Sequence, residues 1–445
     1  MRYIPNSAED RQRMLAEMGL QSIEDLLVGI PRELRFRGDL NLPPPLSETK
    51  LLEKFREYEG RNSKGLVSFL GGGVNAHYIP TVIETLTSRA EFLTSYTPYQ
   101  AEISQGTLQA IFEFQTFICQ LTDMEVSNAS MYDGSTALAE AMLMSARITQ
   151  RHRFLLASTV HPEYRKVVGT YLSHQNLSVE PVEFEEGGTV DIVRVERVLG
   201  DDVAALAVQS PNFLGNLEPI RKLAALAHRR GALLIVNIAE LLSLGIVNGP
   251  GAMGADIVCG EAQSLGIPQS FGGPHVGFLA AREKHVRNLP GRLVGQTVDS
   301  EGKRGFVLTL STREQHIRRE KATSNICTNQ SLFALMATIY CSLLGRKGLR
   351  EVALQNVAKT QYALAEVRKS GKVRVLFEGP RFNEFVLLLP QPFSQVASRF
   401  YDAGIIPGID LGHYFPALSN ALLVSVTETK SKADIDHFIQ ILRTL

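Results

Sequence analysis

Short apolar runs alternate with helix-length amphipathic stretches between residues 65 and 330, and this alternation restricts the possible folds more than any other feature. Runs rich in Val, Ile, Leu and Ala are typical of strands that are covered on both faces. The stretches between them, such as 219–229, repeat apolar residues with the helical period. We therefore predict an α/β fold with a mainly parallel sheet between layers of helices. The predicted strands are Phe154–Thr159, Val203–Gln209, Leu233–Ile238 and Ile257–Cys259.

The segments on either side of this region have different patterns. Residues 1–64 predict an N-terminal helical arm, with helix starts at Ser7 and Ser22 and a stiff proline spacer at 43–45. Such an arm buries little by itself and needs a surface, either the main domain or another subunit. Residues 331–445 open with an apolar helix and continue with mixed strands and helices. We therefore predict a large α/β domain at 65–330, followed by a small C-terminal α+β domain at 331–445.

The composition excludes several function classes. Of 445 residues, 44% are hydrophobic and 21% charged, and the formal net charge is zero, so no global charge favours nucleic acid or an anionic membrane. No run of about 18 apolar residues and no secretion signal is visible, so we expect a cytoplasmic protein. The four cysteines form no CxxC pair, which predicts reduced core residues and neither disulfides nor a metal site. They are Cys119, Cys259, Cys327 and Cys341.

Two candidate ligand sites follow predicted secondary structure in the large domain. Gly134, Ser135 and Thr136 open a helix, where free N–H groups and hydroxyls can hold an anion. An ordinary N-cap explains the same residues, and taken alone this alternative is favoured. His161 directly follows the strand that ends near Thr159, at the edge where open α/β sheets bind ligands. It can stack on a ring there, and a loop histidine without a role fits equally well.

A third candidate is the loop at 96–106, which is dense in polar aromatic residues and hydroxyls. Tyr96, Tyr99, Gln100 and Glu102 suit a small polar ligand or a subunit interface. An ordinary loop with half-buried tyrosines is the alternative. The sequence GPGAMG at 249–254 matches the dinucleotide pattern GxGxxG, but it precedes a predicted strand and contains a proline, so we predict a turn.

Several long stretches resemble the glycine cleavage system P-protein family, also called glycine decarboxylase. The chain is similar to the N-terminal half of that enzyme, which many bacteria and archaea split into two subunits. The resemblance runs nearly from end to end and implies a pyridoxal-phosphate-dependent transferase fold of the aspartate-aminotransferase type. It rests on RYIP at 2–5, FLGGG at 69–73, TPYQAEISQG at 97–106, QSPNF at 209–213, GEAQSLGIP at 260–268 and TREQHIRREKATSNICT at 312–328.

The resemblance also implies which residues should hold pyridoxal phosphate, and both have been replaced. The carboxylate that pairs with the ring nitrogen is expected where Asn237 stands, and the Schiff-base lysine where Gln263 stands. No lysine lies between Lys222 and Lys284, and Lys284 is expected to be solvated. Neutral amides can neither stabilise a pyridinium nor form an imine, so no catalytic residue is expected in this chain alone. Ser135, Thr136 and His161 would then be remnants of phosphate and ring contacts.

The family picture is an α₂β₂ assembly in which subunit 2 carries pyridoxal phosphate on its lysine at the subunit interface. The assembly removes CO₂ from glycine and passes the aminomethyl group to the lipoyl arm of the H-protein. The loop residues Tyr96, Tyr99, Gln100 and Glu102 would reach toward the partner's site. Two alternatives remain: a free-standing pyridoxal-phosphate enzyme that uses another lysine, and a regulatory or scaffold protein.

Overall fold

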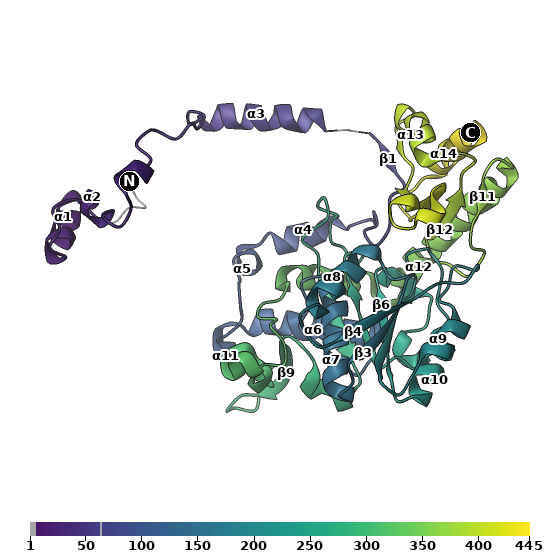
Figure 1. The fold of residues 1–445 in the computed structure, drawn as a ribbon, viewed down its shortest axis with the longest axis horizontal. Helices are drawn as coiled ribbons and strands as arrows, with labels where there is room; N and C mark the ends of the chain where they lie inside the picture. Colours follow the sequence, from purple (N-terminus) through teal and green to yellow (C-terminus); the bar gives the residue numbers. More distant parts are fainter. Residues whose placement is uncertain (1–5, 63–64) are drawn as a thin grey trace. The chain divides into compact units, whose positions relative to one another are not determined.

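The computed structural model describes residues 6–62 and 65–445 (Figure 1). The chain divides into two compact units, Met1–Lys64 and Gly65–Leu445, and each is described by itself. The RYIP motif at residues 2–5 lies outside the described residues. The division of the second unit near residue 330 stays a prediction.

The N-terminal unit consists of short helices that start at predicted caps. Ser7 and Asp10 form a capping box at the start of α1, and Ser47 accepts a hydrogen bond from Lys50 N at the start of α3. Leu15 is the only buried residue among the described helical residues of this unit, so no hydrophobic core holds the helices. Their stability therefore depends on caps and on whatever surface covers them. The helices are α1 (Ala8–Glu17), α2 (Ile23–Leu26) and α3 (Glu48–Arg61).

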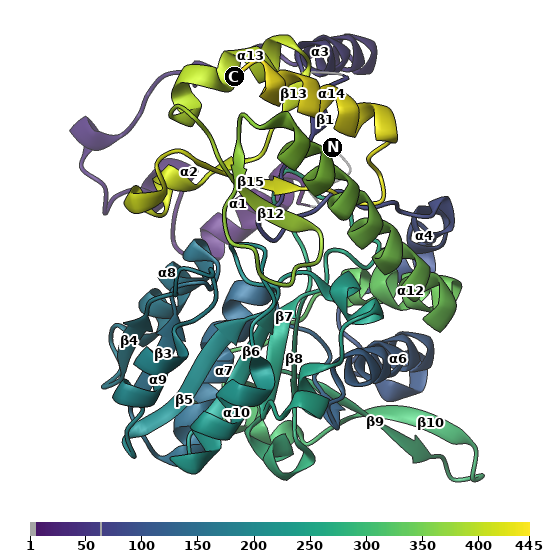
Figure 2. The same cartoon turned by 90° about the vertical axis from the view of Figure 1, so that its right-hand side faces the viewer.

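A seven-stranded sheet forms the centre of the second unit, in the order β2-β8-β7-β6-β5-β3-β4 (Figure 2). The five strands from β7 to β4 are parallel, whereas β8 and β2 pair antiparallel at one edge. Every residue of β5, β6 and β7 is buried, as expected for strands covered on both faces. The strands are β2 (Val126–Ser127), β3 (Arg153–Ala157), β4 (Ser178–Val182), β5 (Val203–Gln209), β6 (Leu233–Ile238), β7 (Ile257–Glu261) and β8 (Gly277–Ala281).

Helices and one hairpin complete the large domain. The segment 249–254 is a single 3₁₀ turn, η4 (Pro250–Met253), that precedes β7, so the prediction of a turn is confirmed. The helices are α4 (Thr81–Thr87), α5 (Ala90–Leu93), α6 (Gln105–Thr122), α7 (Gly134–Thr149), α8 (Pro162–Leu172), α9 (Ile192–Val198), α10 (Ile220–Arg229) and α11 (Gln315–Arg318), and the hairpin strands are β9 (Leu293–Val298) and β10 (Arg304–Thr309).

The C-terminal part is a four-stranded antiparallel sheet, β11-β12-β15-β14, with its own aromatic core. Phe69 stacks on Phe438 there, because β1 pairs with β13 and brings the start of the unit to this sheet. The elements are β1 (Val67–Ser68), β11 (Arg374–Val375), β12 (Glu384–Leu388), β13 (Ile405–Ile406), β14 (Ile409–Asp410), β15 (Ala421–Ser425), α13 (Phe393–Asp402) and α14 (Lys432–Arg443).

The long helix α12 (Ser331–Ser370) connects the two sheets, and its backbone is broken at Gly345. By length and composition this helix meets the test for a membrane span, with a mean hydropathy of 1.2 over 18 residues, although no uninterrupted apolar run marks it. It packs against α4 and α6 at one end and α14 at the other. These contacts bury 33% of the 18-residue window.

The prediction that all four cysteines are core residues is wrong for Cys327. Cys259 and Cys341 are buried and Cys119 is partly buried, but Cys327 is exposed. Cys327 lies in the irregular segment 322–330, where its neighbour Ile326 takes the buried position. All four are free thiols.

Candidate functional site

The carboxyl ends of the parallel strands bring together the residues that the sequence predicted there. Gln209 ends β5 and connects two of them, because its Oε1 accepts hydrogen bonds from the backbone N–H of His161 at 2.9 Å and from Asn237 Nδ2 at 3.3 Å. Gln263 follows β7 two residues beyond its end. This edge is where ligands of open α/β sheets bind, and α7 begins beside it.

The hydroxyls at the start of α7 are used within the helix cap. Asp133 Oδ1 accepts from Thr136 N at 2.7 Å, from Ser135 Oγ at 2.7 Å and from Thr136 Oγ1 at 3.0 Å. The arrangement is a capping box, which was the alternative to an anion site.

Glu261 occupies the anion position that the start of α7 creates. Its Oε2 accepts from Gly134 N at 3.1 Å, and its Oε1 accepts from Ala262 N at 3.1 Å and Val276 N at 3.0 Å. Free N–H groups at a helix start are a ready site for a phosphate or carboxylate, and here the chain supplies the carboxylate itself. Burial raises the pKa of Glu261 to about 8, while its backbone donors act in the opposite direction. Glu261 was not among the predicted site residues, although a glutamate at the end of an apolar strand was a usable signal.

Aromatic rings fill the space next to Glu261. His161 stacks on Tyr164, with ring centroids 4.9 Å apart, and meets Phe213 edge-on at 4.8 Å. A Cβ added to Gly134 would lie 2.6 Å from the Tyr164 hydroxyl, so this tyrosine closes over the helix start. Burial lowers the pKa of His161 to about 4, and its Nδ1 accepts from Glu163 N at 3.1 Å, so the ring is neutral at pH 7.

The two amides at the expected cofactor positions have partners within the chain. Asn237 is fully buried between Gln209 and Cys259. Gln263 is also buried: its Oε1 accepts from Asn75 N at 3.3 Å, and its Nε2 donates to Ile267 O at 2.7 Å. Gln263 thus bridges its own turn and the segment 71–78.

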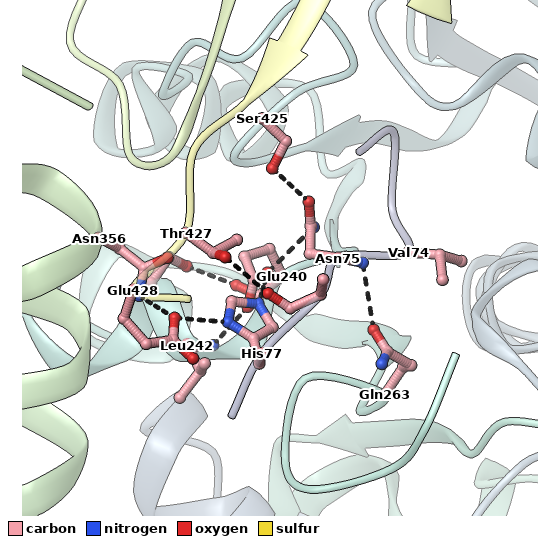
Figure 3. A network of polar contacts seen from close by, with 12 residues as sticks. Val74, Asn75, His77, Glu240, Leu242, Gln263, Asn356, Ser425, Thr427 and Glu428 are labelled. Carbon is pink, nitrogen blue, oxygen red and sulfur yellow. Dashed lines mark hydrogen bonds and ion pairs between the residues drawn. The ribbon is translucent and has the colours of Figure 1, made fainter. Parts of the chain in front are cut away.

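Figure 3 shows that a buried polar network continues from Asn75. Asn75 Nδ2 donates to Glu240 Oε2 at 3.1 Å, and Asn75 Oδ1 accepts from Ser425 Oγ at 2.8 Å. His77 lies between two carboxylates, 2.8 Å from Glu240 Oε2 and 2.9 Å from Glu428 Oε2. The network therefore joins the end of β6, the turn after β7 and the C-terminal sheet.

The electrostatics of this network favour a charged histidine. Burial acts to lower the pKa of His77, but Glu240 and Glu428 outweigh it and raise that pKa to about 10. Burial likewise acts to raise the pKa of Glu428, but His77 outweighs it and lowers that pKa to about 2. Asn356 Nδ2 also donates to Glu428 Oε2 at 2.8 Å. The histidine is therefore an imidazolium at neutral pH.

The tyrosine loop, residues 96–104, packs on Arg292 and not on the strand ends. Tyr96 and Tyr99 are 76% and 62% exposed, and Gln100 and Glu102 are exposed as well. Tyr99 accepts a hydrogen bond from Arg292 Nη2 at 3.0 Å, and the guanidinium carbon lies 5.1 Å from the centre of its ring. These residues face solvent and are not among the groups that contact one another at the strand ends.

Arg292, beneath the tyrosine loop, is buried and incompletely satisfied. Its Nε lies 3.9 Å from Glu314 Oε2. Among the described residues, neither Arg292 Nε nor Glu314 Oε1 has a hydrogen-bond partner. Aromatic residues and arginine are enriched at protein–protein interfaces.

The family model of the glycine cleavage system P-protein matches residues 1–442. The chain belongs to the glycine cleavage system P-protein family. A protein of Geobacillus kaustophilus named probable glycine dehydrogenase (decarboxylating) subunit 1 is 51% identical over 440 residues, 98% of each chain. A protein of Koribacter versatilis with the same name is 52% identical over 438 residues, again 98% of each chain.

Solved structures confirm the fold that the resemblance implied. A crystal structure of glycine decarboxylase (P-protein) in inhibitor-bound form matches with a TM-score of 0.89 and 44% identity over 100% of both chains. A NifS-like protein matches with a TM-score of 0.64 and 12% identity over 85% of this chain and 98% of the other, which shows the fold alone. The P-protein family therefore places this chain in the α/β fold of pyridoxal-phosphate enzymes.

Proposed function

We propose that this chain is subunit 1 of a glycine dehydrogenase (decarboxylating) of the glycine cleavage system, and that the cofactor lysine belongs to subunit 2. The observation that carries this proposal is the strand-end site, which the chain fills with its own side chains. Gln263, an amide, stands where the family resemblance expects the lysine, and the side chain of Glu261 accepts from the helix start.

The residues present do not fit pyridoxal phosphate. The phosphate would compete with Glu261 for the N–H of Gly134, and a pyridine ring would compete with Tyr164 for His161. Asn237 brings no charge to a ring nitrogen. Lys284, the next lysine along the chain, is exposed. Occupation by the cofactor would require several buried side chains to move together.

The proposed assembly contains both subunits, with pyridoxal phosphate on subunit 2, and works in the cytoplasm. It decarboxylates glycine and passes the aminomethyl group to the lipoyl arm of the H-protein. The names of the relatives support the reaction and a partner subunit. This chain would close the interface and supply exposed polar groups from the tyrosine loop.

The isolated chain should bind no pyridoxal phosphate as an imine. We expect no yellow absorbance after incubation with the cofactor, and no phosphopyridoxyl lysine in its mass spectrum after borohydride reduction. Co-expression with a subunit 2 chain should give a stable complex with glycine–bicarbonate exchange activity. A reduced adduct on any lysine of this chain would contradict the proposal and favour a free-standing enzyme, whereas a stable complex without exchange would favour a scaffold.

Substitutions in the tyrosine loop should slow the reconstituted complex. We expect Tyr96→Phe and Glu102→Gln each to reduce kcat about tenfold or more, the effect of losing one hydrogen bond to a charged group. Neither change alters the fold, because both side chains are exposed. Tyr401→Phe, at an exposed site on α13, is the matched control. Unchanged turnover in both loop variants would show that the loop only packs between the subunits.

A further inference from the structure

A polar pocket lies on the α7 side of the large sheet, away from the strand-end site. It has a volume of about 890 Å³, and its walls come from α7, from the end of α8 and from the segment 315–325. Glu140, Leu143 and Arg147 line it from α7. Their spacing of three and four residues places them on one face of that helix.

Two charged groups of this pocket each have one buried atom that lacks a hydrogen-bond partner among the described residues. Glu140 is 2% exposed, and within the described residues its Oε2 finds no hydrogen-bond partner. Arg147 Nε is buried and lacks a partner in the same part of the chain, although its Nη2 donates to Asn288 O at 3.2 Å. A buried carboxylate oxygen and a buried guanidinium N–H each lose stabilisation when left unpaired. A ligand that pairs with both atoms must therefore supply one hydrogen-bond donor and one acceptor.

The distance between the two groups limits the size of what can satisfy both. Seven residues separate Glu140 from Arg147, a rise of roughly 10.5 Å along the helix. The side chains span part of that length, which leaves room for a molecule of a few heavy atoms. Leu143 lies between them and offers an apolar floor that suits a hydrogen or a methyl group. Glu140 and Arg147 partly balance each other's charge, so a ligand with a single charge would be repelled by the group of its own sign.

We propose that this pocket binds a small α-amino acid as a zwitterion, with its ammonium on Glu140 and its carboxylate on Arg147. Burial raises the pKa of Glu140, which Ser324 and Arg147 partly offset, so a bound ammonium would favour the ionised carboxylate. Ser324 belongs to the segment 315–325 that closes the pocket, so occupation would also hold that segment in place.

Isothermal titration of the purified chain with glycine tests the site. The choice of glycine rests on the proposed function, but the site rests on Glu140 and Arg147. We expect saturable binding at one site, also with alanine. N-acetylglycine, which has no ammonium, and glycinamide, which has no carboxylate, should give none. The chain alone is proposed to hold no pyridoxal phosphate, so glycine meets no aldehyde with which to form an imine, and variants of Glu140 and Arg147 assign the heat to this pocket.

Glu140→Gln and Arg147→Gln should each weaken glycine binding about tenfold or more, the effect of losing one hydrogen bond to a charged group. Glu163→Gln, on the exposed surface of α8, is the matched control and should bind as the parent does. Thermal unfolding checks that each variant is folded. Absence of saturable heat with the parent chain, or equal binding by Glu140→Gln, would overturn the proposal. If Glu140→Gln instead weakens association with subunit 2 and glycine gives no heat, the pocket is part of the interface. An imine adduct on this chain would contradict the proposed function without affecting these outcomes.

Discussion

Glu261→Ala should lower the free energy of unfolding by about 3 kcal/mol or more, because it leaves three buried backbone N–H groups without an acceptor. These donors belong to Gly134, Ala262 and Val276, and the first of them opens α7. Urea unfolding of the purified chain measures the loss.

Rescue by an added anion distinguishes the proposed role of Glu261 from a general packing defect. The vacated helix start should bind acetate, so acetate should raise the unfolding temperature of Glu261→Ala and have little effect on the parent. Glu196→Ala, at an exposed position on α9, is the control for removal of a carboxylate. A loss below about 1 kcal/mol, with no response to acetate, would show that the carboxylate does not hold the helix start.

The second large effect is expected at His77. His77→Gln removes the imidazolium between Glu240 and Glu428 and leaves two buried carboxylates without their shared cation. Breaking a buried ion pair by removal of one partner reduces stability by about 3–5 kcal/mol. Urea unfolding should give a loss in this range at pH 6. His413→Gln, where the side chain is 81% exposed, is the control.

The stability difference between the parent and His77→Gln should depend on pH with a defined sign. The pKa of His77 is raised from 6.5 in the unfolded chain to about 10, so its contribution is full below pH 6.5 and is lost as the pH rises through about 10. The pKa of Glu428 is lowered from 4.5 to about 2, so its contribution is full above pH 4.5 and is lost as the pH falls through about 2. The difference should therefore be largest between pH 4.5 and 6.5. A difference that grows from pH 7 to 10 would contradict a charged His77.

Much of the fold could be predicted from local pattern. Val203–Gln209 and Leu233–Ile238 were predicted to the residue, because both faces of these strands are apolar and polar or glycine-containing turns bound them. The apolar helix predicted at the start of 331–445 ends where Gly345 adopts non-helical backbone angles, and a second helical segment then runs to Ser370. The hairpin β9–β10 was not predicted. In the exposed part of these strands polar and apolar residues do not alternate clearly, so the two-residue period of a strand is hard to see.

The strand-end site could be predicted only in part. The rule that ligands bind beyond the carboxyl ends of parallel strands was enough to place His161 at this edge. Asn237 and Gln263 were placed there by the resemblance to the P-protein family. That Glu261 and Tyr164 fill this edge depends on side-chain packing between β7, α7 and α8, which no local pattern encodes.

The His77 network was missed for a similar reason. Its charged members stand at positions 77, 240 and 428, and only the folded chain brings them together. A single sequence gives no signal for a contact between residues so far apart.

The described helices of residues 6–62 share no hydrophobic core, and this affects how much of the protein accumulates in the cell. Large apolar side chains such as Met18, Leu34 and Phe55 stay exposed in this unit. Surfaces of this kind are what chaperones and proteases recognise on incomplete proteins. If the proposed partner subunit covers these side chains, we expect copies synthesised in excess of it to be degraded quickly, so that turnover, as well as gene expression, would set the ratio of the two polypeptides.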